Sequence, residues 1–264
     1  MIYFDYPVSV RYSDLAEDGA LSETAILGMM QEAAARASDL CGFGPRNTRI
    51  YAWALCGWKF RIHKKIGWAE TLNVRTWPRT MAHRTSDRDF IITDKNGDTV
   101  VSATSRWLLL DCATGKAAKI TDEITSRYEF SDERALDEEI PANGRSPEGT
   151  PLAYAYTVVH RDIDTLHHMN NLHYLDLARE ALPEAIRTQH FENIEIVYKR
   201  QIKLDATVRF YYSCTDGKHL VEIMDGEDKK THALLWFFSK QKKKLLRKIP
   251  QEFFIGINSR TDRG

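Results

Sequence analysis

The stretch His160-Arg-Asp-Ile-Asp-Thr-Leu-His-His-Met-Asn-Asn-Leu-His-Tyr-Leu-Asp-Leu177 begins as an acidic, histidine-rich turn and continues as a helix. The helix is expected to begin at Asn170 or Asn171, because an asparagine side chain can cap the first free backbone N–H groups. Asp164 and His168 then lie just before a helix N-terminus, where free N–H donors and the helix dipole favour negative charge. This arrangement suits acyl transfer, which needs a base or nucleophile beside donors for a developing oxyanion.

The order of elements around this stretch occurs twice in the chain. Each half reads as a strand, a polar turn, a long buried helix and a run of antiparallel strands, which is an α+β pattern. An offset of 148 positions, without gaps, also aligns five identical residues: Val10 with Val158, Asp14 with Asp162, Leu27 with Leu175, Glu32 with Glu180, and Ala33 with Ala181. Five identities could arise by chance, so the shared order of elements carries more weight than these identities.

The pattern also divides the chain. A helix from Ser22 to about Leu40 is apolar on most sides, which predicts that a sheet wraps it. Residues 121–140 are charged and are predicted to be helical or partly disordered. Residues 138–151 are rich in Pro and Gly and predict a linker. We therefore expect an N-terminal domain at 1–137, a linker at 138–151 and a C-terminal domain at 152–264.

The two halves differ in their titratable groups. The first half has Ala16 and Ala20 where the second has Asp164 and His168. We therefore expect reactive groups in the second half and an apolar cavity in the first. Methionine and small residues suit a flexible alkyl chain, although methionines are more often plain core than ligand contacts. The candidate cavity residues are Met29, Met30, Ala33 and Trp58.

Composition excludes several classes of protein. Lys plus Arg and Asp plus Glu both number 37, so net charge does not favour nucleic-acid binding. No apolar run approaches the roughly 20 residues that span a bilayer. The four cysteines show no C-x-x-C spacing, and the N-terminus lacks a basic n-region. We expect a cytoplasmic protein with reduced thiols, without a membrane span and without a metal site.

The sequence resembles the acyl-acyl-carrier-protein thioesterases of plants and bacteria. The turn DIDTLHHMNNLHYLD is similar to the family's D-x-D-x-N-x-H-[VM]-N-N signature, and three further segments are similar to the same family. The resemblance covers the chain up to about Ser239. It implies a tandem (double) hotdog fold, in which two antiparallel sheets each wrap around a long central helix. The further segments are RYSDLAEDGALSETAILGMMQEAAA at 11–35, VRTWPR at 74–79 and SRWLLLDCATGKAAKI at 105–120.

The resemblance also implies residue roles. The family's catalytic Asp and His fall on Asp164 and His168. Its Asn, two positions before the His, falls on Leu166, and its acidic residue falls on Gln201. Leucine cannot orient a water, and glutamine can hydrogen-bond but cannot act as a base. Asn171 would fix the turn.

The implied reaction is hydrolysis of fatty acyl-acyl-carrier-protein to free fatty acid and holo-carrier protein, with no cofactor. Asp164 would activate water or attack the carbonyl, and His168 would orient the water or protonate the leaving thiolate. Backbone N–H groups near Asn170 and Asn171 would stabilise the oxyanion. Two alternatives stay open: an acyl-CoA thioesterase, and an acyl-binding protein with weakened catalysis.

The expected partner is acyl carrier protein. The basic run at 242–248 could dock an acidic carrier, or it could be a solvated edge. Hotdog sheets often pair edge to edge, so a homodimer is also open, although duplication within one chain can satisfy the same need.

Overall fold

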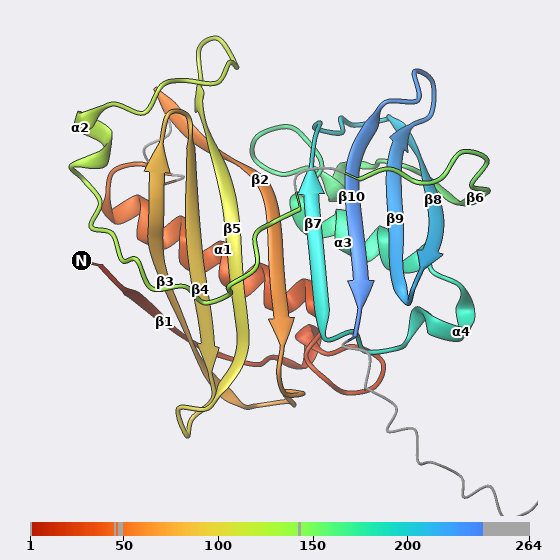
Figure 1. The fold of residues 1–264 in the computed structure, drawn as a ribbon, viewed down its shortest axis with the longest axis horizontal. Coiled ribbons are helices and arrows are strands. Elements are labelled where there is room, and N and C mark those ends of the chain that lie inside the picture. Colours follow the sequence, from red (N-terminus) through yellow and green to blue (C-terminus); the bar gives the residue numbers. More distant parts are fainter. Residues whose placement is uncertain (1, 45, 47–49, 142–143, 240–264) are drawn as a thin grey trace, which may run out of the picture.

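The computed structural model describes residues 2–44, 46, 50–141 and 144–239. Its ten named strands form one antiparallel sheet in the order β1-β3-β4-β5-β2-β7-β10-β9-β8-β6, and α1 and α3 lie on the same face of that sheet (Figure 1). The first half comprises β1 (Phe4–Ser9), α1 (Glu23–Leu40), β2 (Tyr51–Ile62), β3 (Thr71–Ala82), β4 (Thr85–Thr93), β5 (Thr99–Asp111) and α2 (Asp122–Thr125). The second half comprises β6 (Leu152–Thr157), α3 (Asn171–Glu180), α4 (Glu184–Arg187), β7 (Asn193–Tyr198), β8 (Thr207–Thr215), β9 (Lys218–Asp225) and β10 (Thr231–Phe238).

The two half-sheets join through β2 and β7. These strands pair antiparallel from Gly57 opposite Val197 to Arg61 opposite Asn193. A side chain at position 57 would place its Cβ 2.6 Å from the Ile196 carbonyl oxygen, so the close approach of the strands requires glycine. The predicted double hotdog fold is confirmed, with its two sheets fused into one continuous sheet.

The backbone hydrogen bonds confirm the internal repeat. In the first half the Ser22 N–H donates to the Asp14 carbonyl at 2.9 Å, and in the second half the Asn170 N–H donates to the Asp162 carbonyl at 2.8 Å. Both turns precede their helix at the same distance along the chain. Three further features of the turn occur in both halves at the same offset. The Ala16 N–H donates to the Ala20 carbonyl as the Asp164 N–H does to the His168 carbonyl. The bridge Leu15–Leu21 corresponds to Ile163–Met169, and the positive φ of Gly19 corresponds to that of His167.

The long helix α1 lies in the main hydrophobic core. Ser22 caps it by accepting a hydrogen bond from the Ala25 N–H at 3.1 Å, as its sequence predicts. Ile26, Leu27 and Met30 are at most 1% exposed, which places this face of the helix against the sheet. The second central helix, α3, is shorter, and it also packs into this core through Leu175 and Ala178.

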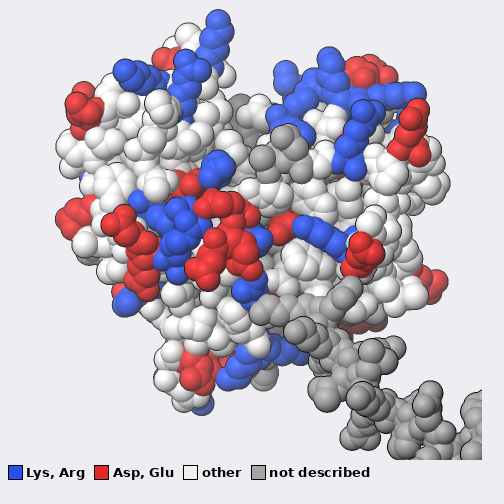
Figure 2. Space-filling model, viewed as in Figure 1, with Lys and Arg blue, Asp and Glu red and all other residues white. Residues whose placement is uncertain are grey.

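The predicted helix over 121–140 is wrong except at α2. From there the chain is extended and crosses the face of the sheet opposite to α1 and α3 (Figure 1). Its charged side chains pair with arginines instead of forming helical pairs: Arg134 with Glu139 at 2.6 Å, and Arg106 with Glu139 at 3.7 Å. Figure 2 shows acidic and basic side chains gathered over this crossing.

The predicted linker also packs against the sheet. Ile140 belongs to a small apolar cluster with Trp236, and the Ser146 N–H donates to the Glu222 carboxylate at 2.8 Å. The division into domains at 1–137 and 152–264 stays a prediction, and the basic run at 242–248 lies outside the described residues. Among the helices that the structure describes, none is long and apolar enough to cross a membrane.

Candidate active site

The turn before α3 is held by side-chain hydrogen bonds to its own backbone. The Asp162 carboxylate accepts from the Val159 N–H at 2.9 Å and from the Tyr156 hydroxyl at 2.7 Å. Asn170 caps the helix, since its side-chain oxygen accepts from the Leu172 N–H at 3.0 Å. The predicted helix start at Asn170 or Asn171 is therefore confirmed, and the turn holds the residues between 162 and 170 in a fixed geometry.

Asp164 and His168 lie side by side within this turn. One Asp164 carboxylate oxygen, Oδ2, lies 3.5 Å from His168 Nδ1, and the other, Oδ1, accepts from the Leu166 N–H at 2.8 Å. The side chains are 21% and 12% exposed, so both are shielded but reachable. The carboxylate is thus oriented by its own backbone and sits next to the imidazole.

The surroundings of His168 assign its tautomer. Nδ1 lies 3.2 Å from the Met169 carbonyl oxygen, and a carbonyl can only accept a hydrogen bond. Nδ1 therefore carries the proton in the neutral ring, which leaves a lone pair on Nε2. Nε2 is the atom of His168 that can take a proton from a water or a nucleophile.

The backbone donors at the helix start are more restricted than the sequence suggested. The Asn170 N–H is occupied by the Asp162 carbonyl, and the Leu172 N–H is occupied by the Asn170 side chain. Among the described residues, the Asn171 N–H has no such partner, as expected at the first position of a helix. The Asn170 N–H is thus occupied, and the Asn171 N–H is the candidate oxyanion donor; oxyanion stabilisation by backbone donors near these two residues stays a prediction.

One tyrosine bonds to Asn171, and a second bonds to Arg200 just after β7. The Tyr198 hydroxyl donates to the Asn171 carbonyl at 3.0 Å, and the Tyr174 hydroxyl donates to the Arg200 carbonyl at 3.4 Å. Burial raises the pKa of Tyr198 well above 10, and burial also raises the pKa of Tyr174. Both phenols therefore stay protonated donors at any working pH.

A cavity of about 940 Å³ opens at this helix start, and both halves of the chain line it. Its size falls in the usual range for small-molecule sites. The second half contributes Asp164, His168, Asn170, Asn171 and Gln201. The structure thus brings together every predicted site residue of the second half.

Gln201 and Leu166 both line this cavity and are exposed. Leu166 is 56% exposed, which is unusual for a large apolar side chain and places it at the cavity mouth. His167 is exposed too, but it is not among the lining residues and adopts a φ of 60°. This position makes His167 a solvent-exposed neighbour of His168.

The structure does not bring the predicted cavity residues of the first half to the cavity. Met29, Met30, Ala33 and Trp58 are at most 7% exposed, and all four belong to the main core. Trp58 packs against Trp107, which itself lines the cavity. Substrate contact by these four residues stays a prediction that this geometry does not support.

A neighbouring face of α1 lines the cavity in their place. Gln31, Ala34, Ala35 and Ser38 follow the i, i+3, i+4, i+7 spacing of one helical face. The side-chain oxygen of Gln31 is buried without a hydrogen-bond partner among the described residues. The sequence offered no signal for choosing this face, because α1 is apolar on most sides. Sheet residues that sequence reasoning missed are Leu55, Arg88 and Trp107, together with Tyr128 after α2.

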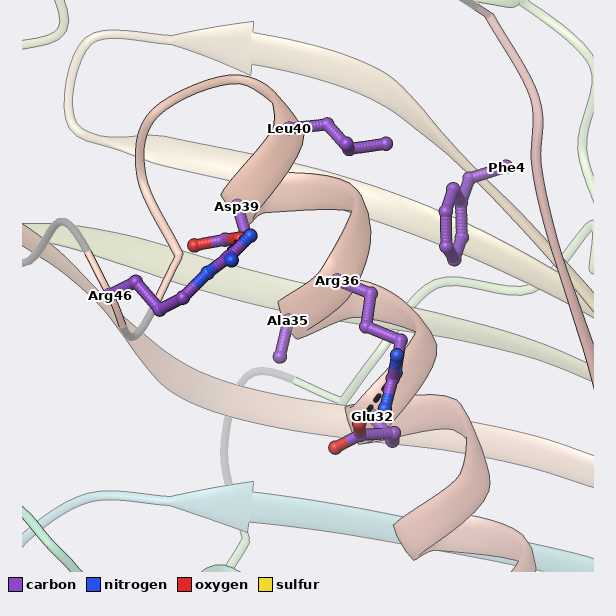
Figure 3. Close-up of a pocket in the computed structure, with 7 residues that line it drawn as sticks. All are labelled: Phe4, Glu32, Ala35, Arg36, Asp39, Leu40 and Arg46. Atoms are coloured by element: carbon purple, nitrogen blue, oxygen red, sulfur yellow. Dashed lines mark hydrogen bonds and ion pairs between the residues drawn. The ribbon is translucent and has the colours of Figure 1, made fainter.

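A second hollow of about 430 Å³ lies beside the C-terminal half of α1 (Figure 3). Its charges are already paired: Arg36 with Glu32 at 2.6 Å, and Arg46 with Asp39. It holds no imidazole or thiol among its lining residues. We therefore place the chemistry in the larger cavity.

Comparisons with known proteins follow the same division into halves. The family described as "Acyl-ACP thioesterase N-terminal domain" matches residues 3–128, and "Acyl-ACP thioesterase C-terminal domain" matches residues 146–238. Together these matches cover most of the chain.

The curated relatives are distant in sequence. A chloroplastic dodecanoyl-[acyl-carrier-protein] hydrolase from Cinnamomum camphora is 23% identical over 86% of this chain and 65% of its own length. A chloroplastic palmitoyl-acyl carrier protein thioesterase from Arabidopsis thaliana is 21% identical over 86% of this chain and 62% of its own length. The chain therefore spans less than two thirds of the length of these relatives.

Solved structures share the fold. An acyl-ACP thioesterase from Bacteroides thetaiotaomicron superposes with a TM-score of 0.79 at 19% identity, covering 89% of this chain and 97% of the other. A 12:0-ACP thioesterase from Umbellularia californica gives a TM-score of 0.78 at 22% identity, covering 89% of this chain and 96% of the other. These likenesses establish the double hotdog architecture over nearly the whole chain.

Proposed function

The chain belongs to the acyl-ACP thioesterase family, and we propose on that basis that it hydrolyses fatty acyl thioesters of acyl carrier protein to free fatty acid and holo-carrier protein. One observation carries the proposal. Asp164 and His168 lie at 3.5 Å from each other at the start of α3, on the wall of a cavity that both halves line. A carboxylate–imidazole pair, a free backbone N–H and a large cavity are the parts that thioester hydrolysis needs.

In the proposed reaction, water attacks the thioester carbonyl carbon and gives its proton to His168 Nε2. The carbonyl oxygen becomes an oxyanion and accepts a hydrogen bond from the Asn171 N–H, an interaction often worth about 3 kcal/mol. The C–S bond then breaks, and the thiolate takes the proton from His168. Asp164 lies against the imidazolium that forms in between, and its negative charge stabilises that cation.

Leu166 and Gln201 stand where the family has an asparagine and an acidic residue, so the site lacks those two side chains. Leu166 cannot orient a water, so the positioning of the nucleophile falls on Asp164 and His168. Gln201 lines the same cavity and can donate to the thioester carbonyl or hold the attacking water, but it cannot remove a proton. The acid–base chemistry therefore rests on two residues.

Kinetics of purified variants test this proposal. Asp164→Asn and His168→Ala should each lower kcat at least 100-fold, since general acid–base groups typically contribute about 10²–10⁴-fold. Release of free thiol from acyl-ACP measures the rate. His167→Asn is the matched control, because His167 is adjacent, exposed and off the cavity, and it should keep wild-type turnover. If Asp164→Asn and His168→Ala both keep their turnover, the assignment fails.

The carrier and the alternatives are decided by the same assay. Wild-type protein that hydrolyses acyl-CoA faster than acyl-ACP is an acyl-CoA thioesterase. Protein that binds fatty acid but releases no thiol from either carrier is a weakened acyl-binding protein, the outcome that Leu166 and Gln201 would explain. The cytoplasmic location, the absence of nucleic-acid binding and the homodimer stay predictions; the sheet ends at β1 and β6, and these edges are where a second copy would pair.

A further inference from the structure

Arg88 is a buried cation on the wall of the candidate active-site cavity. It lies on β4, is 6% exposed and lines the cavity. Its side chain donates one described hydrogen bond, from Nη1 to the Thr76 hydroxyl at 3.2 Å. Among the described residues no carboxylate forms an ion pair with Arg88. The two carboxylates next to it on β4 pair with other arginines: Asp87 with Arg106, and Asp89 with Arg79.

Such a charge is unfavourable unless something compensates it. Burial lowers the pKa of Arg88 to about 10, so the guanidinium is still protonated at neutral pH. Buried guanidinium groups in proteins are normally paired with a carboxylate or phosphate, because desolvation of the isolated cation is costly. Arg88 therefore has the character of half of an ion pair whose other half is not supplied by the described residues.

The neighbours of Arg88 are hydrogen-bonding groups. Ser86 precedes it on the same face of β4 and also lines the cavity. The Tyr128 hydroxyl accepts from Trp53 Nε1 at 3.2 Å, and Tyr128 lies close enough to Arg88 to affect its pKa. The cavity is also lined by apolar residues of the sheet, among them Ala54, Leu55 and Leu108. Its wall thus combines the Arg88 group, the polar start of α3 and apolar side chains.

The strand order gives the separation between Arg88 and Tyr198, whose hydroxyl bonds to the first residue of α3. Arg88 is on β4, whereas Tyr198 ends β7, and the sheet order places β5 and β2 between these strands. Three strand spacings correspond to about 14 Å. This span suits an extended acyl chain whose thioester lies at Asp164 and His168 and whose far end lies at Arg88.

We propose that the preferred acyl group ends in a carboxylate and that Arg88 binds this carboxylate at the far end of the cavity. This inference rests on the proposed function, because it assumes that the thioester sits at the start of α3. The substrate class is then the monothioester of a long-chain dicarboxylic acid. Arg88, with Ser86 and Tyr128 as further donors, supplies the charge and hydrogen bonds that a buried carboxylate needs.

Two matched thioesters test the proposal with the full-length protein. Both carry acyl chains with the same number of heavy atoms on the same carrier, one ending in a methyl group and one in a carboxylate. Wild type should show the higher kcat/KM for the carboxylate-ended substrate. Arg88→Met should lower that value about 10- to 100-fold, the usual effect of losing a hydrogen bond to a charged group, and should not lower the value for the methyl-ended substrate.

Two further variants separate recognition from structure. Arg88→Lys keeps the charge and should recover part of the preference for the carboxylate-ended chain. Arg84→Met makes the same substitution in the exposed turn before β4, off the cavity, and should leave both rates unchanged. A wild type that prefers the methyl-ended chain, or an Arg88→Met variant that keeps the wild-type ratio of the two rates, overturns the proposal.

Binding of the free acids keeps the inference distinct from the hydrolase proposal. A long-chain dicarboxylic acid should raise the Tm of wild type more than the matched monocarboxylic acid does, and Arg88→Met should abolish the difference. If no thioester is hydrolysed but this difference is found, the proposed function fails and the Arg88 site stands. If both acids raise the Tm equally in wild type, the Arg88 site fails whatever the hydrolysis assays show.

Discussion

The Tyr198 hydroxyl connects a strand end to the first residue of α3. It donates to the Asn171 carbonyl at 3.0 Å, and its raised pKa keeps it a donor throughout the working range of pH. Tyr198→Phe removes one donor from this carbonyl, which keeps its hydrogen bond within α3, and should cost about 1 kcal/mol of stability. Because Asn171 also carries the candidate oxyanion donor, kcat should fall several-fold while KM changes little. Urea unfolding and steady-state kinetics on the same preparation check both effects, and an unchanged kcat would separate Tyr198 from the site.

Single residues differ in how far sequence predicts their role. Asp164, His168 and Asn171 lie within eight consecutive positions of one turn, so their proximity follows from local sequence alone. Arg88 and Gln31 reach the same cavity from β4 and α1, and nothing in their local sequence marks them. Their position depends on which face of the strand or helix meets the cavity, and this is set by packing between halves of the chain.

The two helix caps provide a comparison between equivalent elements. Ser22 and Asn170 hold the same position in the two halves and each accepts one backbone N–H. Ser22→Ala and Asn170→Ala should each cost about 1 kcal/mol. Only Asn170→Ala should also lower kcat/KM, because only α3 begins beside Asp164 and His168. Urea midpoints and thiol release measure the two effects; equal activity losses in both variants would contradict a functional difference between the helices.

Most elements could be predicted from periodicity and turn residues, and the errors have physical causes. The hairpin of β4 and β5 can be recognised from Asn96-Gly97, because such a pair favours a turn with positive φ, and Gly97 has a φ of 85°. The segment 121–140 has the charge pattern of a solvated helix, but Glu138 and Glu139 pair with arginines on the sheet, Arg61 on β2 and Arg106 on β5. Local sequence does not show partners that come from distant strands, so that segment was assigned incorrectly.

The internal repeat assigns the cavity at the start of α3 an equivalent region in the other half of the molecule. Gln31 and Asn171 line the cavity, and the offset of 148 positions relates them to Arg179 and Glu23. Arg179 and Glu23 form an ion pair, so the equivalent region is bridged by side chains. Arg179 also donates to two backbone carbonyls at 2.8 Å and lies over the ring of Phe191. The two halves therefore differ in which side chains occupy these equivalent positions.

Breaking this ion pair should therefore affect stability and leave catalysis intact. The Arg179 and Glu23 side chains are 17% and 9% exposed, so Arg179→Met leaves a carboxylate without its partner and should cost about 3 kcal/mol. Adding Glu23→Gln should recover much of that loss, since the stranded charge is gone. The rate per folded molecule should stay at the wild-type value in both variants, because neither residue lines the cavity. Arg36→Met, in an exposed pair with Glu32 on α1, is the control and should leave the urea midpoint unchanged. An Arg179→Met variant as stable as Arg36→Met would mean that this pair does not hold the two halves of the fold together.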